Sequence, residues 1–140
     1  MSYAFLGHKW GPTEFGEAAG PVTWSADLTS LPFDEGAHDL VDFQDALRDA
    51  FQSWEDVAAI DFTEVSGTAD VTVTVGAFDQ PSFVGLTEWT VIDGPGLDTP
   101  YDMTLTFDIE EMWSPGVGDD LNFYAVATHE VGHVLGLDHV

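Results

Sequence analysis

The sequence predicts a single α+β domain that combines a five-stranded sheet with two helices. Its length of 140 residues is that of about one domain, and a hydrophobic content of 44% is sufficient for a core. Several segments alternate apolar and polar residues as strands do, and two others repeat apolar residues every three or four positions as helices do. We therefore expect one domain over residues 1–140.

The N-terminal part is predicted to begin with an irregular arm. Residues 1–20 are rich in glycine and proline, which favour turns over regular structure. A strand is predicted at residues 22–25. A helix is predicted over residues 39–57, because apolar residues recur there at spacings of three and four. Its predicted buried face consists of Leu40, Phe43, Leu47, Ala50, Phe51, Trp54 and Ala58.

Four more strands are predicted in the middle of the chain. Residues 60–65 and 70–75 form two of them, with a turn at Gly67 between them. Residues 83–92 form a third, which ends in a segment of strong turn formers. Residues 103–109 alternate apolar and polar side chains and form the last strand of the predicted sheet.

A second helix is predicted over residues 120–137. Asp119, Asp120 and Asn122 are the candidate N-cap residues, because short polar side chains accept hydrogen bonds from the first turn of a helix. At about 100° per residue, one face of this helix is apolar and the opposite face carries two histidines. The apolar face consists of Phe123, Ala127, Val131 and Val134.

The charge of the chain excludes several classes of partner. There are 26 acidic residues against two basic ones, Lys9 and Arg48, for a net charge of -24. This excess opposes binding to nucleic-acid phosphate or to an anionic membrane, whereas Ca²⁺ or high ionic strength would relieve the repulsion. No apolar run approaches the ~20 residues that span a bilayer, and the N-terminus has no signal-peptide pattern. Cysteine is absent, so no thiolate can serve as ligand or nucleophile.

The segment from His129 to His139 carries the chemistry. It fits the pattern H-E-x-x-H-x-x-G-x-x-H, in which two histidines stand four residues apart on the second predicted helix. Residues four apart differ by about 40° in azimuth and about 6 Å in height, so the imidazoles of His129 and His133 can reach one ion. We therefore predict that these two histidines are zinc ligands.

The remaining residues of the motif complete this predicted zinc site. Gly136 permits the chain to turn after the helix, because glycine adopts the left-handed conformation that ends helices, and His139 can then approach as the third ligand. Three imidazoles leave a fourth position for water, as in catalytic zinc sites. Glu130 is rotated by about 100° from His129, which directs its carboxylate to that water. We predict that Glu130 is the general base and then the general acid in peptide hydrolysis.

Further segments extend the pattern beyond this motif. They are Trp10-Gly11-Pro12, Pro21-Val22-Thr23-Trp24-Ser25, Ala69-Asp70-Val71, Gly85-Leu86, and the stretch from Phe107 to Ser114. With the zinc motif, they resemble the matrixin branch of the metzincin metallopeptidases, the matrix metalloproteinase-like enzymes, and the related bacterial serralysins. The resemblance implies a zincin-like catalytic domain, with a twisted five-stranded mixed sheet, one antiparallel edge strand and two helices. It also implies a secreted, extracellular zinc endopeptidase with protein or peptide substrates, which we expect to be a monomer.

The resemblance implies two further sites. In matrixins the edge strand pairs with an extended substrate, which implies that residues 84–90 bind substrate here through main-chain hydrogen bonds. Leu86, Thr87 and Glu88 are the candidate substrate-binding residues, and Glu88 would face or flank the cleft. Asp108 and Glu111 match the acidic pair that holds a structural Ca²⁺ in matrixins, and carboxylate oxygens suit that ion.

The C-terminal end departs from the family pattern. Matrixins carry a methionine-containing turn shortly after the third histidine, whereas this sequence stops at Val140 and its methionines all precede the motif. We therefore expect a C-terminally short domain without that turn, and two alternatives to an active peptidase stay open. One is a catalytically impaired zinc- and calcium-binding module, and the other is an acidic Ca²⁺-dependent binding or adhesion domain. Glu130 favours the enzyme, because zinc binding alone needs no base at that position.

Overall fold

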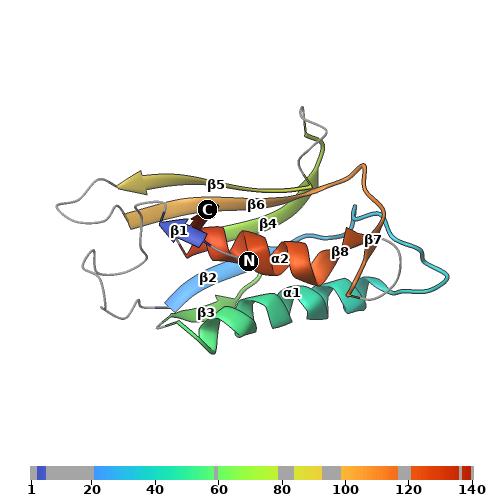
Figure 1. The fold of residues 1–140 in the computed structure, drawn as a ribbon, viewed down its shortest axis with the longest axis horizontal. Coiled ribbons are helices and arrows are strands. Elements are labelled where there is room, and N and C mark those ends of the chain that lie inside the picture. The colour runs from blue at the N-terminus through green and yellow to red at the C-terminus, as the bar shows by residue number, and fades with distance from the viewer. Residues whose placement is uncertain are drawn as a thin grey trace.

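A five-stranded mixed sheet forms the centre of the fold (Figure 1). Its strand order is β3-β2-β4-β6-β5. β2 (Pro21–Ala26) pairs in parallel with β3 (Asp61–Glu64) and β4 (Val71–Gly76), and β4 pairs in parallel with β6 (Thr99–Asp108). β5 (Gly85–Ile92) lies at one edge, antiparallel to β6. The prediction of five strands with one antiparallel edge strand is therefore confirmed.

The structure is a computed structural model. It describes residues 3–5, 21–58, 60–78, 84–92, 99–116, 121–135 and 137–139. Within these ranges, no helix combines the length and the apolar character that crossing a bilayer requires.

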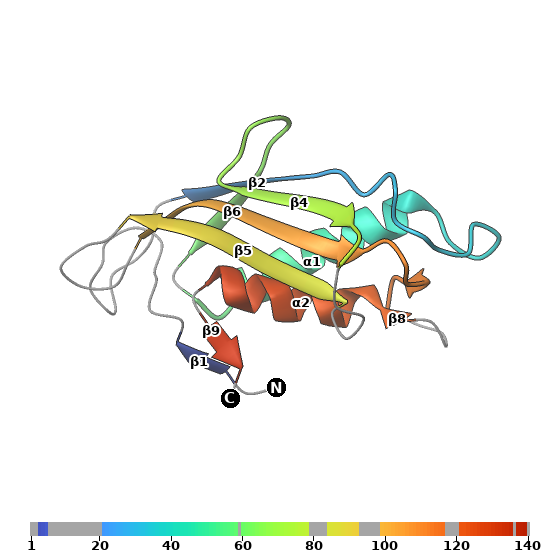
Figure 2. The same cartoon turned by 90° about the horizontal axis from the view of Figure 1, so that it is seen from above.

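Both helices cover the same face of the sheet (Figure 2). α1 (Leu40–Glu55) packs there through Phe51, whose ring stacks on Trp24 of β2 with 4.4 Å between the ring centroids. α2 (Phe123–Val134) packs through Phe123, whose ring centroid lies 4.5 Å from that of Phe107 in β6. Since strand residues opposite one another share a face, the register of the sheet decides which side chains α2 meets.

The core between sheet and helices agrees with the predicted apolar faces. The four residues predicted for α2 are fully buried, and burial of each large apolar side chain contributes about 1.5–3 kcal/mol to folding. In α1 the predicted residues are buried or pack against the buried cluster. The largest fully buried side chains are Trp113, Phe43, Phe51, Phe107, Phe123, Leu28, Leu47, Met103 and Leu105.

The helix ends show why the boundaries lie where they do. The main-chain nitrogen of Asp39 donates to Oδ2 of Asp42 (2.9 Å), which stabilises the start of α1. Asn122, one of three N-cap candidates, is the N-cap of α2, and its Oδ1 accepts from the main-chain nitrogen of Ala125 (3.0 Å). α2 ends at Val134, earlier than predicted, because the chain turns there towards a short strand, β9 (Leu137–His139).

Two small sheets were not predicted. β1 (Tyr3–Phe5) pairs antiparallel with β9, and β7 (Trp113–Ser114) pairs in parallel with β8 (Leu121–Asn122). The prediction of an irregular arm over residues 1–20 is therefore wrong at residues 3–5, and the rest of that arm lies outside the described residues. Strands of two or three residues contain too few positions for an alternating pattern, and their pairing depends on partners far away in sequence.

Candidate metal centre

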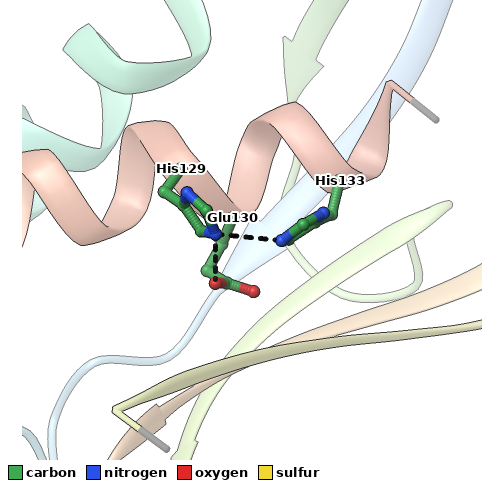
Figure 3. Close-up of side chains that lie close together, drawn as sticks. All are labelled: His129, Glu130 and His133. Atoms are coloured by element: carbon green, nitrogen blue, oxygen red, sulfur yellow. Dashed lines mark hydrogen bonds and ion pairs between the residues drawn. The ribbon is translucent and has the colours of Figure 1, made fainter. Parts of the chain in front are cut away.

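α2 brings two of the predicted zinc ligands together. The Nε2 atoms of His129 and His133 lie 3.1 Å apart. Their ring centroids are 4.7 Å apart and the ring planes are almost perpendicular, at 87°. Figure 3 shows both rings turned towards a common point, with the Glu130 carboxylate approaching the same nitrogen of His129. The spacing of one helical turn therefore produces the convergence that the motif predicts.

The geometry of these donors fits a zinc ion. Two Zn–N bonds at the tetrahedral angle would place the nitrogens about 3.3 Å apart, close to the observed separation. Within the described ranges, His129, Glu130 and His133 are the one group of three possible metal-ligating side chains, with donor atoms within 4.8 Å of one another. His133 is buried and His129 is half-buried, so an ion bound here would be partly shielded from solvent.

Glu130 lies beside the two imidazoles and has its own hydrogen-bond donor. The residue is 5% exposed. Its Oε2 lies 3.9 Å from Nε2 of His129, farther than the about 3.3 Å expected between two ligands of one tetrahedral zinc. Its Oε1 accepts a hydrogen bond of 2.8 Å from the hydroxyl of Thr87 in β5. The carboxylate therefore fits a position next to the ligand set, as the general-base role requires.

The third predicted ligand is described only in its main chain. His139 ends β9 and lies opposite Tyr3 in the register of β1 and β9, but its side chain lies outside the described part of the structure. The chain leaves α2 at Val134 and begins β9 at Leu137, as expected from a turn between them. Gly136, which we predicted to permit that turn, also lies outside the described residues. The assignment of His139 as a ligand stays a prediction.

Gly85 makes room for the Glu130 side chain. A Cβ atom at this position would lie 3.0 Å from Cγ of Glu130 and 3.0 Å from Cγ1 of Val126. β5 and α2 therefore approach each other so closely here that a side chain on Gly85 would have to displace those of Glu130 and Val126. In the sequence, Gly85 stands out only as a landmark of the family resemblance; the signal for its role is a glycine at the start of a strand, which often marks a close approach of two elements.

The register of β5 separates the three candidate substrate-binding residues. Thr87 lies opposite Leu105, whose side chain is fully buried on the core face, so Thr87 faces α2. Leu86 and Glu88 lie opposite Thr106 and Thr104, on the face of the sheet away from the helices. Only the side chain of Thr87 is thus brought to Glu130, while the main chain of all three residues lies on the edge strand.

The two candidate calcium ligands lie at the end of β6 and just after it. Asp108 is 5% exposed, and its Oδ1 accepts a hydrogen bond of 2.9 Å from the main-chain nitrogen of Glu110. Glu111 lies in the bend that follows and is half-buried. The carbonyl oxygen of Asp108 accepts from Nε1 of Trp113 (2.9 Å), which fixes the main chain of the turn. The two acids are therefore three residues apart on a main chain that these two hydrogen bonds fix.

Comparison with known proteins supports this arrangement. The family model described as Matrixin matches residues 23–140. Matrix metalloproteinase-19 of Homo sapiens is 40% identical over 100 residues, covering 67% of this chain and 19% of that protein. The hatching enzyme of Paracentrotus lividus is 31% identical over 126 residues, covering 85% of this chain and 20% of that protein. Metallopeptidase AprA of Pseudomonas marginalis is 36% identical over 92 residues, covering 64% of this chain and 19% of that protein. The chain spans about a fifth of the length of these curated relatives.

Proposed function

This chain belongs to the matrixin family and has the mixed sheet and two helices of a metzincin catalytic domain, and from that premise we propose that it is a zinc-dependent endopeptidase. The observation that carries the proposal is the convergence of His129 and His133, at 3.1 Å between their Nε2 atoms, with a buried carboxylate beside them. A buried glutamate next to two converging imidazoles suits metal-assisted hydrolysis better than it suits metal storage.

Zinc, when bound, polarises the scissile carbonyl and makes water more acidic. Glu130 is the residue that moves the proton: its Oε2 accepts a proton from the attacking water and later donates it to the leaving amine nitrogen. His129 and His133 hold the ion from one helical turn, and we propose His139 as the third ligand. The turn between α2 and β9 supports this, because it ends the helix soon after His133.

Peptide substrates are proposed to bind along β5. This strand lies at the edge of the sheet with β6 on its other side, so its outer main-chain groups can pair with an extended chain. Leu86, Thr87 and Glu88 supply main-chain groups at the level of the metal centre, since Thr87 contacts Glu130. Recognition through main-chain hydrogen bonds suits a protein or peptide substrate.

We also propose that Asp108 and Glu111 bind a structural Ca²⁺. A buried carboxylate needs a compensating charge, and the chain has two basic residues against 26 acidic ones. Arg48 is engaged elsewhere: it bonds Glu64 (2.8 Å) and Asp45 (2.9 Å), and the bond to Glu64 raises the pKa of its guanidinium. Calcium also binds main-chain carbonyl oxygens and waters, so two acids three residues apart can supply the carboxylate ligands of such a site.

An extracellular location is proposed from the relatives. Matrix metalloproteinase-19 and the interstitial collagenase of Sus scrofa, 36% identical over 107 residues, have names that refer to the matrix and to the interstitium. The absence of cysteine is compatible with any redox compartment. We propose that the protein acts there as a monomer.

The proposal is tested by zinc-loaded protein acting on unstructured peptides. Glu130→Gln should keep zinc and the fold while reducing kcat by about 10²–10⁴, because the amide cannot take up the proton. Glu35→Gln, in an exposed turn, is the matched control and should retain parental turnover. A parent protein that binds zinc yet cleaves no peptide would instead support the binding-module alternative. Parental activity in Glu130→Gln would exclude Glu130 as the proton-transfer group.

A further inference from the structure

We infer that Thr87 is a positioning residue for the catalytic carboxylate. Its hydroxyl holds Oε1 of Glu130, so that Oε2 is the oxygen turned towards the metal centre. This inference rests on the proposed function, since it assigns the means by which Glu130 is oriented for proton transfer. It gives the side chain of Thr87 a role distinct from that of its main chain on the substrate edge.

The hydroxyl of Thr87 has one proton and two acceptors within reach. Its Oγ1 lies 2.8 Å from Oε1 and 3.2 Å from the main-chain oxygen of Glu130. The first distance is typical of an O–H···O hydrogen bond and the second is longer than such bonds usually are. A hydroxyl also bonds a carboxylate more strongly than it bonds a neutral carbonyl. The proton therefore lies on the side of the carboxylate.

Both partners are buried, which makes the bond specific. Thr87 is 7% exposed and Glu130 is 5% exposed. Water is thus a poor substitute for the hydroxyl, because a donor removed from a buried acceptor is not readily replaced. Gly85, two residues earlier on the same strand, adds no side chain there: a Cβ built at this position would lie 3.0 Å from Cγ of Glu130.

Thr87 is itself held rigidly. Its main chain is paired with Leu105 in β6, and its β-branched side chain has a restricted χ1 torsion. The terminal torsion of a glutamate, in contrast, is broad and about two-fold, so its two oxygens interchange easily without a donor. A fixed donor on one oxygen selects one of these orientations. The 3.9 Å between Oε2 and Nε2 of His129 is the result.

Two substitutions separate the hydroxyl of Thr87 from the rest of its side chain, and a third is a control. Thr87→Val keeps the shape and β-branching and removes the donor. Thr87→Ser keeps the donor and removes the methyl group. Thr104→Val, on the opposite face of the neighbouring strand, is a matched control for exchanging a threonine of the sheet.

The first measurement is peptide hydrolysis by the zinc-loaded proteins. Thr87→Val should lower kcat by about 10- to 100-fold with KM nearly unchanged, as expected for loss of a hydrogen bond to a charged group. Thr87→Ser should stay within about threefold of the parent. If Thr87 had only a structural role, both variants would lower kcat by similar amounts, whether or not they keep the hydroxyl.

The second measurement does not depend on activity. Crystal structures of zinc-loaded parent, Thr87→Val and Thr87→Ser report the Glu130 orientation, and chelator competition reports zinc affinity. The Glu130 carboxylate should rotate away from its parental orientation only in Thr87→Val. Zinc affinity should stay within about threefold of the parent in both variants, because no ligand is altered. Thr87→Ala replaces Thr87→Val if the latter does not fold.

The outcomes of the two measurements distinguish this inference from the proposed function. If the parent shows no hydrolysis, the proposed function fails, and the Glu130 orientation in the crystals still decides the role of Thr87. An unchanged Glu130 orientation in Thr87→Val overturns the inference. So does a loss of turnover in Thr87→Ser as large as that in Thr87→Val.

Discussion

Nε1 of Trp54 donates a hydrogen bond of 2.8 Å to the main-chain oxygen of Thr128. Trp54 lies in the last turn of α1, and Thr128 immediately precedes the first metal-ligand candidate, His129. A second bond joins the same helices, 2.7 Å between the hydroxyls of Ser53 and Tyr124. These two bonds to α1 therefore fix the position of α2 along the α2 axis, next to the metal centre.

Trp54→Phe should lower the free energy of unfolding by about 1 kcal/mol, because it removes one hydrogen bond and some packing while keeping an aromatic ring. Tyr124→Phe is the comparison, since it removes the other interhelical bond farther from His129. Urea denaturation of zinc-free protein measures both. Equal stability of Trp54→Phe and the parent would mean that this bond contributes nothing to the helix pair.

One zinc per chain is expected, with histidine nitrogens as ligands. His129→Ala and His133→Ala should each lower zinc affinity by more than about 100-fold, since even outer partners of metal ligands contribute about 10–100-fold. His139→Ala should show the smallest loss, because β9 is a three-residue strand. Elemental analysis after dialysis and chelator competition measure these effects. His38→Ala, whose ring packs against Phe43, is the control and should bind zinc as the parent does.

Gly85→Ala should disturb the contact between β5 and α2 next to the metal centre. The new methyl group would lie 3.0 Å from side-chain carbons of Glu130 and Val126, so these side chains must be displaced, at a cost of about 1–3 kcal/mol in the free energy of unfolding. Gly76→Ala in β4 is matched to it, because its Cβ would meet only Thr106 Cγ2 at an ordinary 3.4 Å. Tm, measured by thermal melts, and the rate of peptide hydrolysis should both fall much further for Gly85→Ala than for Gly76→Ala. Equal effects of the two substitutions would contradict the close approach of β5 and α2.

Calcium is expected to raise Tm beyond what salt does. An ion bound only by the folded state contributes about 2.7 kcal/mol at 100 times its Kd, equivalent to roughly 10 °C for a domain of this size. NaCl at matched ionic strength should give only the part of the Tm increase that comes from screening the net charge of -24.

The control for this calcium effect lies within the same chain. Asp108→Asn keeps an acceptor for the main-chain nitrogen of Glu110 and should abolish the difference between Ca²⁺ and NaCl. Asp34→Asn alters a similar turn, in which Oδ1 accepts from Gly36 at 2.9 Å, and should leave the difference intact. A difference that survives in Asp108→Asn would remove the proposed calcium site.

The long elements and the convergence of His129 and His133 could be predicted from the sequence, because both follow from local periodicity. β1 and β9 could not, since strand pairing between residues 3–5 and 137–139 leaves no local pattern. The contact of Thr87 with Glu130 depends on the register between β5 and β6. A shift of one residue would have turned Leu86 and Glu88 to the helix instead. The sequence therefore identified the right strand, but it was Glu88 that we expected at the cleft, whereas Thr87 is the residue that contacts Glu130.

The pairing of β1 with β9 has a consequence for how the metal centre assembles. His129 and His133 converge as soon as one turn of α2 forms, a local event on the helix-formation timescale. The main chain of His139 is aligned by Tyr3, from the other end of this sequence, and closing so long a loop carries an entropy cost that must be met before the contact forms. Metal capture should thus proceed in two kinetic stages, with a fast, weak complex preceding a slow, tight one. The slower rate would report the docking of residues 3–5.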